Sequence, residues 1–366
     1  MTKVCHMTIA EAGAIPRILK ESETALKMGM EVWIVCIAEI NTNYKKNNIN
    51  FLCVQKYQDR TDRVFKTDKK IYQAAKAINA DIYQIHDPEL LRYSIKLHKK
   101  RKKIIFDSHE FYRIQIMTKP YISPVFRKIV SIIYNYYEYY YCKKVDAVLS
   151  VCTINGKSYF EDRCKKEIMI ENVPALIPKN HVKKDYIVTK RVIYAGWISY
   201  ERGVLYLAKA AKLAGVTLVL CGYFSNDKIK EDLLRGEYSD NIEYRGVLPR
   251  EELYEVFKTC DLGACTLLSV GQYDMIDTLP TKVYEYMMVG LPVIMTNTRI
   301  NHKMNEKFNF GICVAPDDVK EIADAFNSLI ENSEKMYFLG QNGRTAVERE
   351  LNWEIQEKKL KEIYCV

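Results

Sequence analysis

The feature of this chain that most constrains its fold is a regular alternation of short apolar runs with amphipathic stretches. The runs show little polar alternation, which is typical of strands buried on both faces of a parallel sheet. The stretches between them have helical spacing, so the pattern predicts an α/β architecture. In the first half we expect strands at residues 3–9, 31–37, 49–54, 81–86, 103–108 and 146–151.

The same pattern begins again after residues 172–190, which are rich in Pro, Asn and Lys and are typical of a linker. The 366 residues are enough for two domains of ordinary size. We therefore expect two Rossmann-like, doubly wound domains facing a cleft, with ligands beyond the carboxyl ends of the strands. In the second half we expect strands at residues 191–196, 217–222, 241–246, 261–266, 292–296 and 311–315. The expected boundaries are 1–175, 176–350 and, for a C-terminal helix that crosses back to the first domain, 351–366.

The composition, with 48% hydrophobic and 28% charged residues, is that of a soluble globular protein. No segment approaches the roughly 18 uninterrupted apolar residues of a membrane span, and the first residues lack a secretory signal. The 11 cysteines include no Cys-x-x-Cys pair, which favours reduced thiols in the cytoplasm. The net charge of +9 suggests an anionic partner, but no nucleic-acid-binding motif accompanies it.

Residues 277–297, DTLPTKVYEYMMVGLPVIMTN, place a short helix directly before a buried strand. Pro280 suits the first helical position and Gly290 the helix end. Lys282 and Glu285 then lie on the first turns, where free backbone N–H groups favour anions. This combination suits a ligand with both phosphate and hydroxyl groups, and a solvated ion pair is the alternative.

A similar junction opens the second half. A strand ends at Gly196, and a helix begins at Arg202-Gly203 after a short loop. A cation beside free helix N–H groups is suited to hold a diphosphate. A surface arginine is the alternative for Arg202 alone, but both junctions lie at strand ends of the same half, which favours a shared site.

Two histidine–acid pairs follow predicted strands in the first half. HDPELL contains His86 and Asp87, and DSHEFY contains His109 and Glu110. A histidine at a strand end can transfer a proton, donate to a phosphate or bind a sugar hydroxyl. The pattern favours a structural role for His86, at the start of a helix, and a functional role for His109. Their spacing matches no metal-ligand pattern, so we expect no metal.

The loop after the first strand, EAGAIPRILKES, lacks a full Gly-x-Gly-x-x-Gly motif, which counts against a dinucleotide dehydrogenase. Gly13 permits a close approach of backbone to a ligand. Arg17 and Lys20 lie one turn apart on the following helix. A position at the cleft and a solvated face are both consistent with this spacing.

Five segments in order along the chain resemble glycosyltransferase family 4, retaining enzymes of the GT-B fold. YAGWISYERGVLYLAKAA and LPTKVYEYMMVGLPVIMTN are similar to its donor-site segments. RILKESETALKMGMEVWIV, DIYQIHDPELL and IIFDSHEFY are similar to its acceptor-domain segments. The resemblance implies transfer of a sugar from a nucleotide-sugar with retention at the anomeric carbon.

The resemblance also implies roles for single residues. Glu285 matches the acid that binds the ribose, and Asp277, a shorter acid than the usual glutamate, matches the one that contacts the donor sugar. His109 matches a histidine that contacts the transferred sugar. Trp197 stands where many members have an arginine, so one phosphate-binding cation is missing unless Lys282 supplies it. The expected catalytic residues are His109, Asp277, Arg202 and Lys282. The expected donor-binding residues are Gly13, Gly196, Arg202, Thr278, Leu279, Pro280, Lys282 and Glu285, and the expected acceptor-binding residues are Arg17, His86 and Glu110.

By the same resemblance, the nucleoside-diphosphate sugar is a co-substrate, and we expect no cofactor and no metal. The acceptor is expected to be a saccharide or a lipid-linked saccharide used in surface polysaccharide synthesis. A nucleotide-sugar epimerase of a similar fold and a non-catalytic sugar-binding protein of two domains are the alternatives. Incubation with the donor alone would distinguish an epimerase, because it needs no acceptor.

Residues 112–144 are dense in tyrosine and isoleucine, with basic residues at both ends. The pattern predicts one long helix over 125–142 and favours burial of 130–142 on the first sheet. For 113–128 we expect peripheral membrane contact as the alternative to burial. Such contact would suit an enzyme at the inner face of the membrane.

Overall fold

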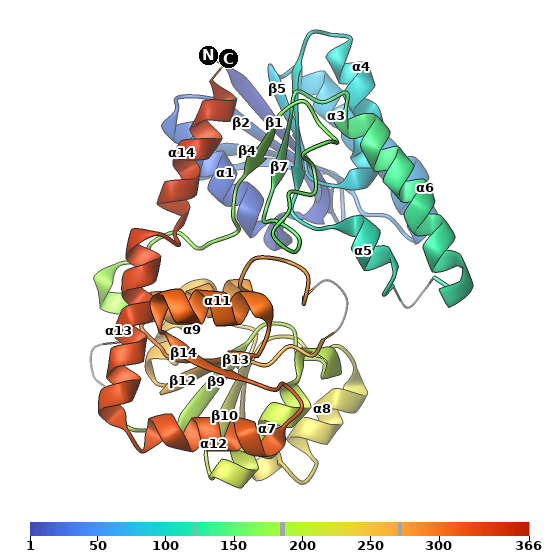
Figure 1. The fold of residues 1–366 in the computed structure, drawn as a ribbon. Helices are drawn as coiled ribbons and strands as arrows, with labels where there is room; N and C mark the ends of the chain where they lie inside the picture. Colours follow the sequence, from blue (N-terminus) through green and yellow to red (C-terminus); the bar gives the residue numbers. More distant parts are fainter. Residues whose placement is uncertain (120–121, 184–186, 270–272, 366) are drawn as a thin grey trace. The chain divides into compact units, whose positions relative to one another are not determined.

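The computed structural model describes residues 1–119, 122–183, 187–269 and 273–365. They form two compact units, Met1–Asn172 with Trp353–Val366 and Val173–Asn352, each built on its own sheet (Figure 1). Every strand that the sequence predicts is present. The sheets are parallel apart from one edge pair, so the predicted α/β class is confirmed.

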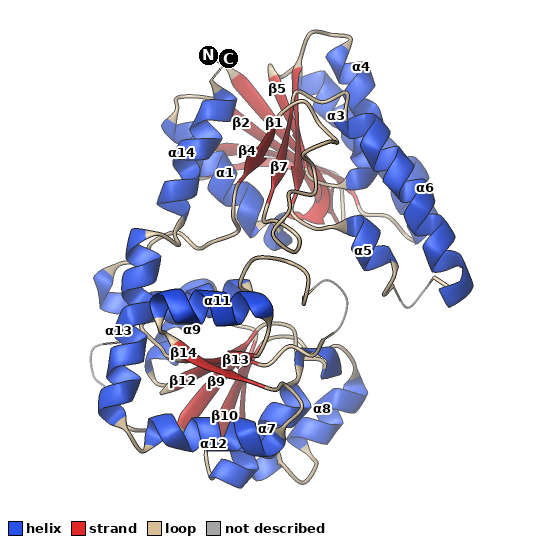
Figure 2. Ribbon diagram, viewed as in Figure 1, coloured by secondary structure: helices blue, strands red, loops and turns tan. Residues whose placement is uncertain are grey.

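The sheet of the first unit has the strand order β3-β4-β2-β1-β5-β6-β7-β8, and only β3 pairs antiparallel among its described strands. Helices cover both faces of the sheet (Figure 2). The strands are β1 (Lys3–Glu11), β2 (Glu31–Ala38), β3 (Thr42–Lys46), β4 (Ile49–Gln55), β5 (Ile82–Ile85), β6 (Lys103–Ser108), β7 (Ala147–Ser150) and β8 (Glu167–Met169). The α-helices are α1 (Pro16–Lys27), α2 (Arg60–Asp62), α3 (Asp68–Ile78), α4 (Ser94–His98), α5 (Tyr112–Ile116), α6 (Pro124–Cys142) and α14 (Trp353–Tyr364). Two 3-10 helices, η1 (Ala12–Ala14) and η3 (Pro88–Tyr93), and a π-helix, η2 (Arg63–Thr67), lie between them.

The sequence did not reveal the two edge strands, β3 and β8. β3 has the sequence TNYKK and is almost wholly exposed, and β8 has three residues, none of them buried. An edge strand needs no apolar run, because at least one side of it faces solvent. Apolar runs therefore mark the central strands in the sequence but do not mark these two edge strands.

The sheet of the second unit has the order β11-β10-β9-β12-β13-β14 and is parallel throughout its described strands. Its core is split into two layers, because successive residues of β9, such as Val192 and Ile193, point into different clusters on opposite faces. The strands are β9 (Arg191–Ala195), β10 (Thr217–Cys221), β11 (Ile242–Gly246), β12 (Leu262–Cys265), β13 (Val293–Thr296) and β14 (Gly311–Val314). The helices are α7 (Val204–Ala214), α8 (Asp227–Leu234), α9 (Arg250–Lys258), α10 (Thr281–Val289), α11 (Arg299–Phe308), α12 (Val319–Ile330) and α13 (Ser333–Arg349), with turns η4 (Lys179–His181), η5 (Tyr200–Arg202) and η6 (Ser239–Asn241).

The C-terminal helix α14 belongs to the first unit, where it packs against α1. The indole N–H of Trp353 donates to Thr24 Oγ1 at 3.3 Å, and Lys27 Nζ lies 3.1 Å from a carboxylate oxygen of Glu357. Trp353 is almost fully buried, so this helix is part of the core of the first unit.

The prediction for residues 130–142 is wrong in one respect. The long helix is present as α6, but it is not buried: Ile133, Tyr136 and Tyr140 are 63%, 70% and 52% exposed. The many tyrosine and isoleucine residues led to a prediction of burial, but composition alone does not show which face of a helix packs against its domain. No described helix is both long and apolar enough to cross a bilayer.

Candidate functional site

The strand order of the second unit defines one place for a ligand. β9 lies between β10 and β12, so the chain leaves β9 toward one edge of the sheet and later returns on its other side. At such a switch point the loops after the two strands diverge and leave room at the carboxyl edge. The loops after β9 and β12 therefore border the candidate site.

Two glycines shape the loop after β9. Gly203 has a φ of +71°, and a Cβ atom there would lie 1.9 Å from the carbonyl oxygen of Thr266, which follows β12. Gly196 has a φ of +121°, and a Cβ atom there would lie 3.4 Å from Nζ of Lys282. Glycine at 203 thus lets the two loops meet, and the positive φ angle favours glycine at 196, next to Lys282 Nζ.

Lys282, on the first turn of α10, has a side-chain amino group that is buried and has a perturbed pKa. Its Nζ atom is buried, lies 3.5 Å from the centroid of the Tyr194 ring and has no hydrogen-bond partner in the described part of the chain. Burial and, to a smaller extent, the cation of Arg202 lower the pKa of Lys282 to about 7, although Cys265 and the carboxylate of Glu285 oppose this shift. A buried ammonium without an acceptor is unfavourable, and an anionic ligand would supply the acceptor.

Arg202 ends η5, directly before Gly203 and the start of α7. It is half-buried, and its guanidinium carbon lies 5.1 Å from the centroid of the Tyr273 ring. The first backbone N–H groups of α7 have no acceptor within the helix. Because Arg202 and Lys282 disfavour each other's charge, an anion at this edge of the sheet would stabilise both.

Two arginines form ion pairs with Glu285 and Asp277, the carboxylates expected from the sequence to bind the donor. Arg250, at the start of α9, donates from Nη2 to Glu285 at 2.6 Å. Arg299, at the start of α11, pairs with Asp277. Sequence reasoning missed both arginines, because they lie 35 and 22 residues from their partners and follow no local spacing. A ligand hydroxyl that binds one of these carboxylates must either share the carboxylate with its arginine or displace the arginine.

The segment Thr278–Pro280 leads into α10, as predicted. The hydroxyl of Tyr284 lies 3.2 Å from Thr278 Oγ1 and accepts from the backbone N–H of Leu279 at 3.4 Å. The backbone N–H of Leu279, a residue expected to bind the donor, therefore already has an acceptor within the protein. A small pocket next to this segment is lined by Leu267, Tyr273, Ile276, Thr278, Pro280, Thr296, Thr298, Ile300 and Asn301.

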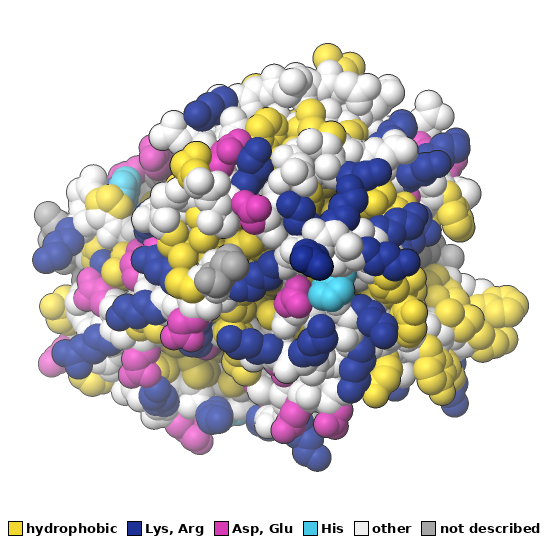
Figure 3. All heavy atoms as spheres, turned by 90° about the horizontal axis from the view of Figure 1, so that it is seen from above, with side chains coloured by type: hydrophobic (Ala, Val, Ile, Leu, Met, Phe, Trp, Pro, Cys, Tyr) yellow, Lys and Arg dark blue, Asp and Glu magenta, His cyan; other side chains and the backbone are white. Residues whose placement is uncertain are grey.

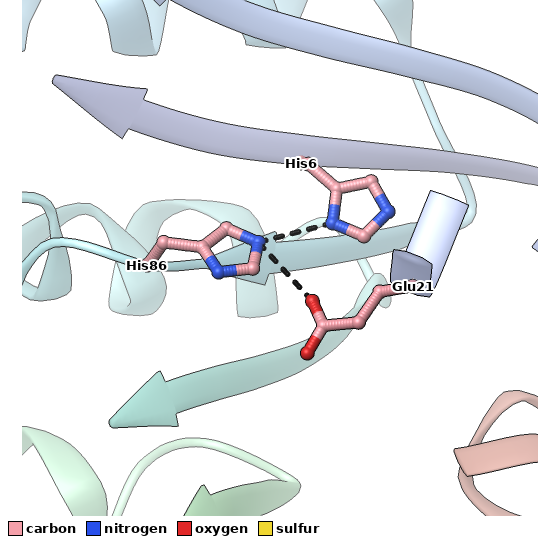
Figure 4. Close-up of side chains that lie close together, drawn as sticks. All are labelled: His6, Glu21 and His86. Atoms are coloured by element: carbon pink, nitrogen blue, oxygen red, sulfur yellow. Dashed lines mark hydrogen bonds and ion pairs between the residues drawn. The ribbon is translucent and has the colours of Figure 1, made fainter. Parts of the chain in front are cut away.

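A buried polar cluster connects β1, β5, β6 and α1 of the first unit. His6 Nδ1 lies 3.0 Å from His86 Nε2, and His86 Nδ1 lies 2.9 Å from Asp107 Oδ2 (Figure 4 shows the two histidines). Arg17 donates two hydrogen bonds to Asp107, at 2.8 and 2.9 Å. A carboxylate oxygen of Glu21 lies 3.2 Å from Arg17 Nε, and the other lies 3.9 Å from His86 Nε2.

The charges in this cluster are set by burial and by the Arg17 cation. Burial opposes ionisation of Asp107, but Arg17 and the hydrogen bond from His86 hold its pKa well below the usual range. Burial and the nearby Asp107 raise the pKa of Glu21, and burial lowers the pKa of both histidines. His86 therefore donates from Nδ1 to an ionised carboxylate, and its Nε2 accepts from His6.

Two groups in this cluster have ligand atoms close enough to hold a metal ion. They are His6, Glu21 and His86, and His86, Asp107 and His109. Their nitrogen and oxygen donors suit a divalent transition metal. In the first group a metal would replace the hydrogen bond between the histidines, and in the second it would compete with an arginine for Asp107.

The structure changes the interpretation of two residues expected to bind the acceptor. Arg17 and His86 are 6% and 2% exposed, and both are hydrogen-bonded to Asp107, so Arg17 does not lie on a solvated face. Lys20 is also buried, with Nζ 3.2 Å from Asn172 Oδ1. In the described structure Arg17 and His86 support Asp107 from inside the unit and present no free polar atom to a ligand.

The other first-unit residues lie nearer the surface. The His109 side chain is 36% exposed, with Nδ1 4.0 Å from Asp107 Oδ2. Glu110 is half-buried, and its backbone carbonyl accepts from Ser108 Oγ at 3.1 Å. Gly13 is exposed in η1, and a Cβ atom there would meet no described atom within 4 Å. Sequence reasoning singled out His109 and Glu110 but missed Asp107, although this acid stands at the end of the same strand.

Comparison with known proteins agrees with this geometry. Residues 179–346, within the second unit, match the family model described as glycosyl transferases group 1. The chain matches no curated protein sequence.

Several solved structures share the fold over the whole chain. Sucrose-phosphate synthase from Thermosynechococcus elongatus is 14% identical, with a TM-score of 0.77 over 100% of this chain and 98% of the other. HepE from Anabaena, in complex with UDP and glucose, is 14% identical, with a TM-score of 0.71 over 99% of each chain. WaaG, a glycosyltransferase involved in lipopolysaccharide biosynthesis, is 12% identical, with a TM-score of 0.69 over 100% of each chain. The GT-B fold implied by the sequence resemblance is thereby confirmed, and the findings support a glycosyltransferase.

Proposed function

We propose that this chain is a glycosyltransferase whose second unit binds a nucleotide-sugar donor. The observation that carries the proposal is the buried, unpaired ammonium of Lys282 beside the glycine loop after β9. Arg202 and the start of α7 add positive potential at the same edge of the sheet. These groups suit a leaving nucleoside diphosphate, whose negative charge grows in the transition state. In this proposal Glu285 binds the ribose and Asp277 the donor sugar.

Retention follows from attack on the same face of the sugar that the leaving group departs from. The acceptor hydroxyl oxygen forms a bond to the anomeric carbon while the bond from that carbon to the diphosphate oxygen breaks. The acceptor proton passes to the departing phosphate oxygen. Arg202 and Lys282 supply the positive charge that stabilises the diphosphate, so the proposal needs no metal. His109 contributes a contact to the transferred sugar.

The acceptor in this proposal is a saccharide or a lipid-linked saccharide used in surface polysaccharide synthesis. Its support is the similarity to WaaG, which is involved in lipopolysaccharide biosynthesis. Glu110 and His109, the more accessible of the predicted first-unit residues, are the side chains we assign to the acceptor and the transferred sugar.

The test is a thermal-shift screen against UDP, GDP, ADP and CDP sugars, with UDP-glucose first because HepE is solved in complex with it. A ligand at about 100 times its dissociation constant should add about 2.7 kcal/mol of apparent stability. The shift should be lost in Lys282→Ala and Glu285→Ala and retained in Lys320→Ala, which removes an exposed lysine paired with Asp324. No shift with any nucleotide sugar would contradict the donor site.

Product analysis then separates transfer from its alternatives. Incubation of the wild-type protein with the selected donor, with EDTA and with or without saccharide acceptors, should give a glycosylated product that requires an acceptor. An altered sugar formed without an acceptor would identify an epimerase. Binding without any turnover would favour a sugar-binding protein.

A further inference from the structure

Helix α6 reverses the usual arrangement of a surface helix, because apolar side chains are exposed on it while polar ones are buried. Its buried residues are Ser131, Glu138 and Cys142, and the first two form polar contacts with the rest of the first unit. Ser131 Oγ donates to the Arg113 carbonyl at 3.1 Å, and Tyr159 Oη donates to Glu138 at 2.7 Å. Arg163 Nη1 lies 3.6 Å from the same carboxylate. Ser131 and Glu138 thus form their polar contacts within the protein.

The opposite side of α6 presents apolar side chains to the surroundings. Its members recur at intervals of three or four residues, so they form one continuous stripe along the helix. Their exposed fractions run from 36% to 75%, far above those of a helix packed on a core. The stripe consists of Val125, Phe126, Ile129, Val130, Ile132, Ile133, Tyr136, Tyr139 and Tyr140. An apolar patch of this extent is typical of an interaction site.

The charges around the stripe indicate what covers it. Residues 111–145 contain six basic side chains and one acid, and this acid, Glu138, is buried. Lys128 is exposed near the beginning of the stripe. Lys143 and Lys144 are exposed at its end, with Nζ atoms 5.1 and 5.6 Å from the rings of Tyr139 and Tyr140. Cations at both ends of the stripe, and no exposed acid among the described residues of 111–145, favour contact with an anionic surface.

Figure 3 shows the same combination on one face of the molecule. Hydrophobic side chains gather toward the right margin of the view, the side on which Figure 1 draws α6. Lys and Arg side chains gather beside them on this face. A further basic run, 96–103, follows from α4 in the same unit, and Lys99, Lys100 and Arg101 are exposed.

We propose that the exposed face of α6 binds the first unit to an anionic lipid surface. The aliphatic and aromatic side chains enter the boundary between headgroups and acyl chains, and the basic side chains contact the headgroups. Tyrosines along the stripe suit this boundary because each ring is apolar and each hydroxyl remains hydrated. This proposal does not depend on the proposed transfer reaction, since vesicle binding requires no donor.

The predicted contact over 113–128 overlaps this surface in part. Within it, Met117, Val125 and Phe126 are exposed and Ile116 is buried, whereas residues 120–121 lie outside the described residues. The surface proposed here extends to residue 140, into the part that the sequence pattern assigned to the core.

The test is sedimentation of the full chain with vesicles of phosphatidylcholine alone and with roughly one third phosphatidylglycerol. We expect binding to the anionic vesicles that weakens as salt is raised above about 0.15 M. Ile133→Asp with Tyr136→Asp should weaken this binding at least about tenfold, because two carboxylates would enter the apolar boundary. Lys143→Glu with Lys144→Glu should weaken it on anionic vesicles alone.

The matched control is Leu213→Asp with Phe338→Asp, which changes two side chains of similar exposure on α7 and α13. All variants should keep the melting temperature of the wild type, because every substituted side chain is exposed. Equal vesicle binding by wild type and the α6 variant would overturn the proposal, as would an absence of binding to both vesicles. A wild-type dimer in light scattering that the α6 variant dissolves, without vesicle binding, would assign the stripe to a second copy of the chain instead.

Discussion

If the proposed donor binds beside Lys282, we expect binding to be coupled to the uptake of a proton, and the size of this uptake follows from the pKa of Lys282. Its pKa of about 7 means that most of the free protein at pH 8 carries a neutral amine. A diphosphate beside Nζ favours the charged form and raises this pKa in the complex. Binding should therefore take up about 0.9 proton at pH 8 and about half a proton at pH 7. Since the complex binds more protons than the free protein, affinity should fall about tenfold for each pH unit above 7.

Titration calorimetry in two buffers of different ionisation enthalpy measures this uptake. The ligand is the nucleotide sugar that the thermal-shift screen selects, because its diphosphate diester has no ionisation of its own near neutral pH. The control is Lys282→Arg, which keeps the positive charge but has a guanidinium that stays protonated. This variant should bind without proton uptake, whereas Lys282→Met should lose both the uptake and most of the affinity.

Two results would refute the reasoning. Wild-type uptake below about 0.2 proton at pH 8 would contradict the combination of a lowered pKa in the free protein and a ligand that contacts Lys282 Nζ. Equal uptake by wild type and Lys282→Arg would assign the proton to another group. Either result would leave the donor site to Arg202 and the start of α7.

Three further predictions concern single residues. Arg250→Ala frees Glu285 from its ion pair, so nucleotide-sugar affinity should change at least about threefold in calorimetry, and an unchanged affinity would separate this pair from the donor site. Gly203→Ala should destabilise the chain by more than about 3 kcal/mol in denaturant titration, because it adds a backbone clash to the strain of a positive φ. The control Gly215→Ala, with φ +66° and open space around it, should cost about 1 kcal/mol. Equal losses of stability in the two variants would contradict the clash. Asp107→Asn removes the carboxylate that accepts both hydrogen bonds from the buried Arg17 guanidinium, so it should cost about 3–5 kcal/mol of stability. An unchanged melting temperature in thermal unfolding would contradict this.

Much of the first-unit cluster lay beyond prediction from the sequence. The histidine and acid of DSHEFY were found because they stand at the end of an apolar run. That Arg17 and His86 bind Asp107 could not be predicted, since Arg17 is 90 residues away from it in the chain. Parallel strands bring such residues to one edge of a sheet, and which of them touch depends on the register of β1, β5 and β6. A charged residue on a helix looks the same in the sequence whether it forms a buried ion pair or faces solvent.

By itself the sequence determined where the central strands lie, because each requires a run of apolar residues, and where α10 begins and ends, because Pro280 and Gly290 fix those points locally. It also determined that Arg202 lies in the loop after a strand and Lys282 on the first turn of a helix of the same unit. Only the tertiary structure decided that the Lys282 ammonium is buried without a partner, that Arg250 holds Glu285, and that α6 turns its apolar side outward. Strand and helix signals are periodic and local, whereas burial and pairing depend on which distant residues the sheet brings together.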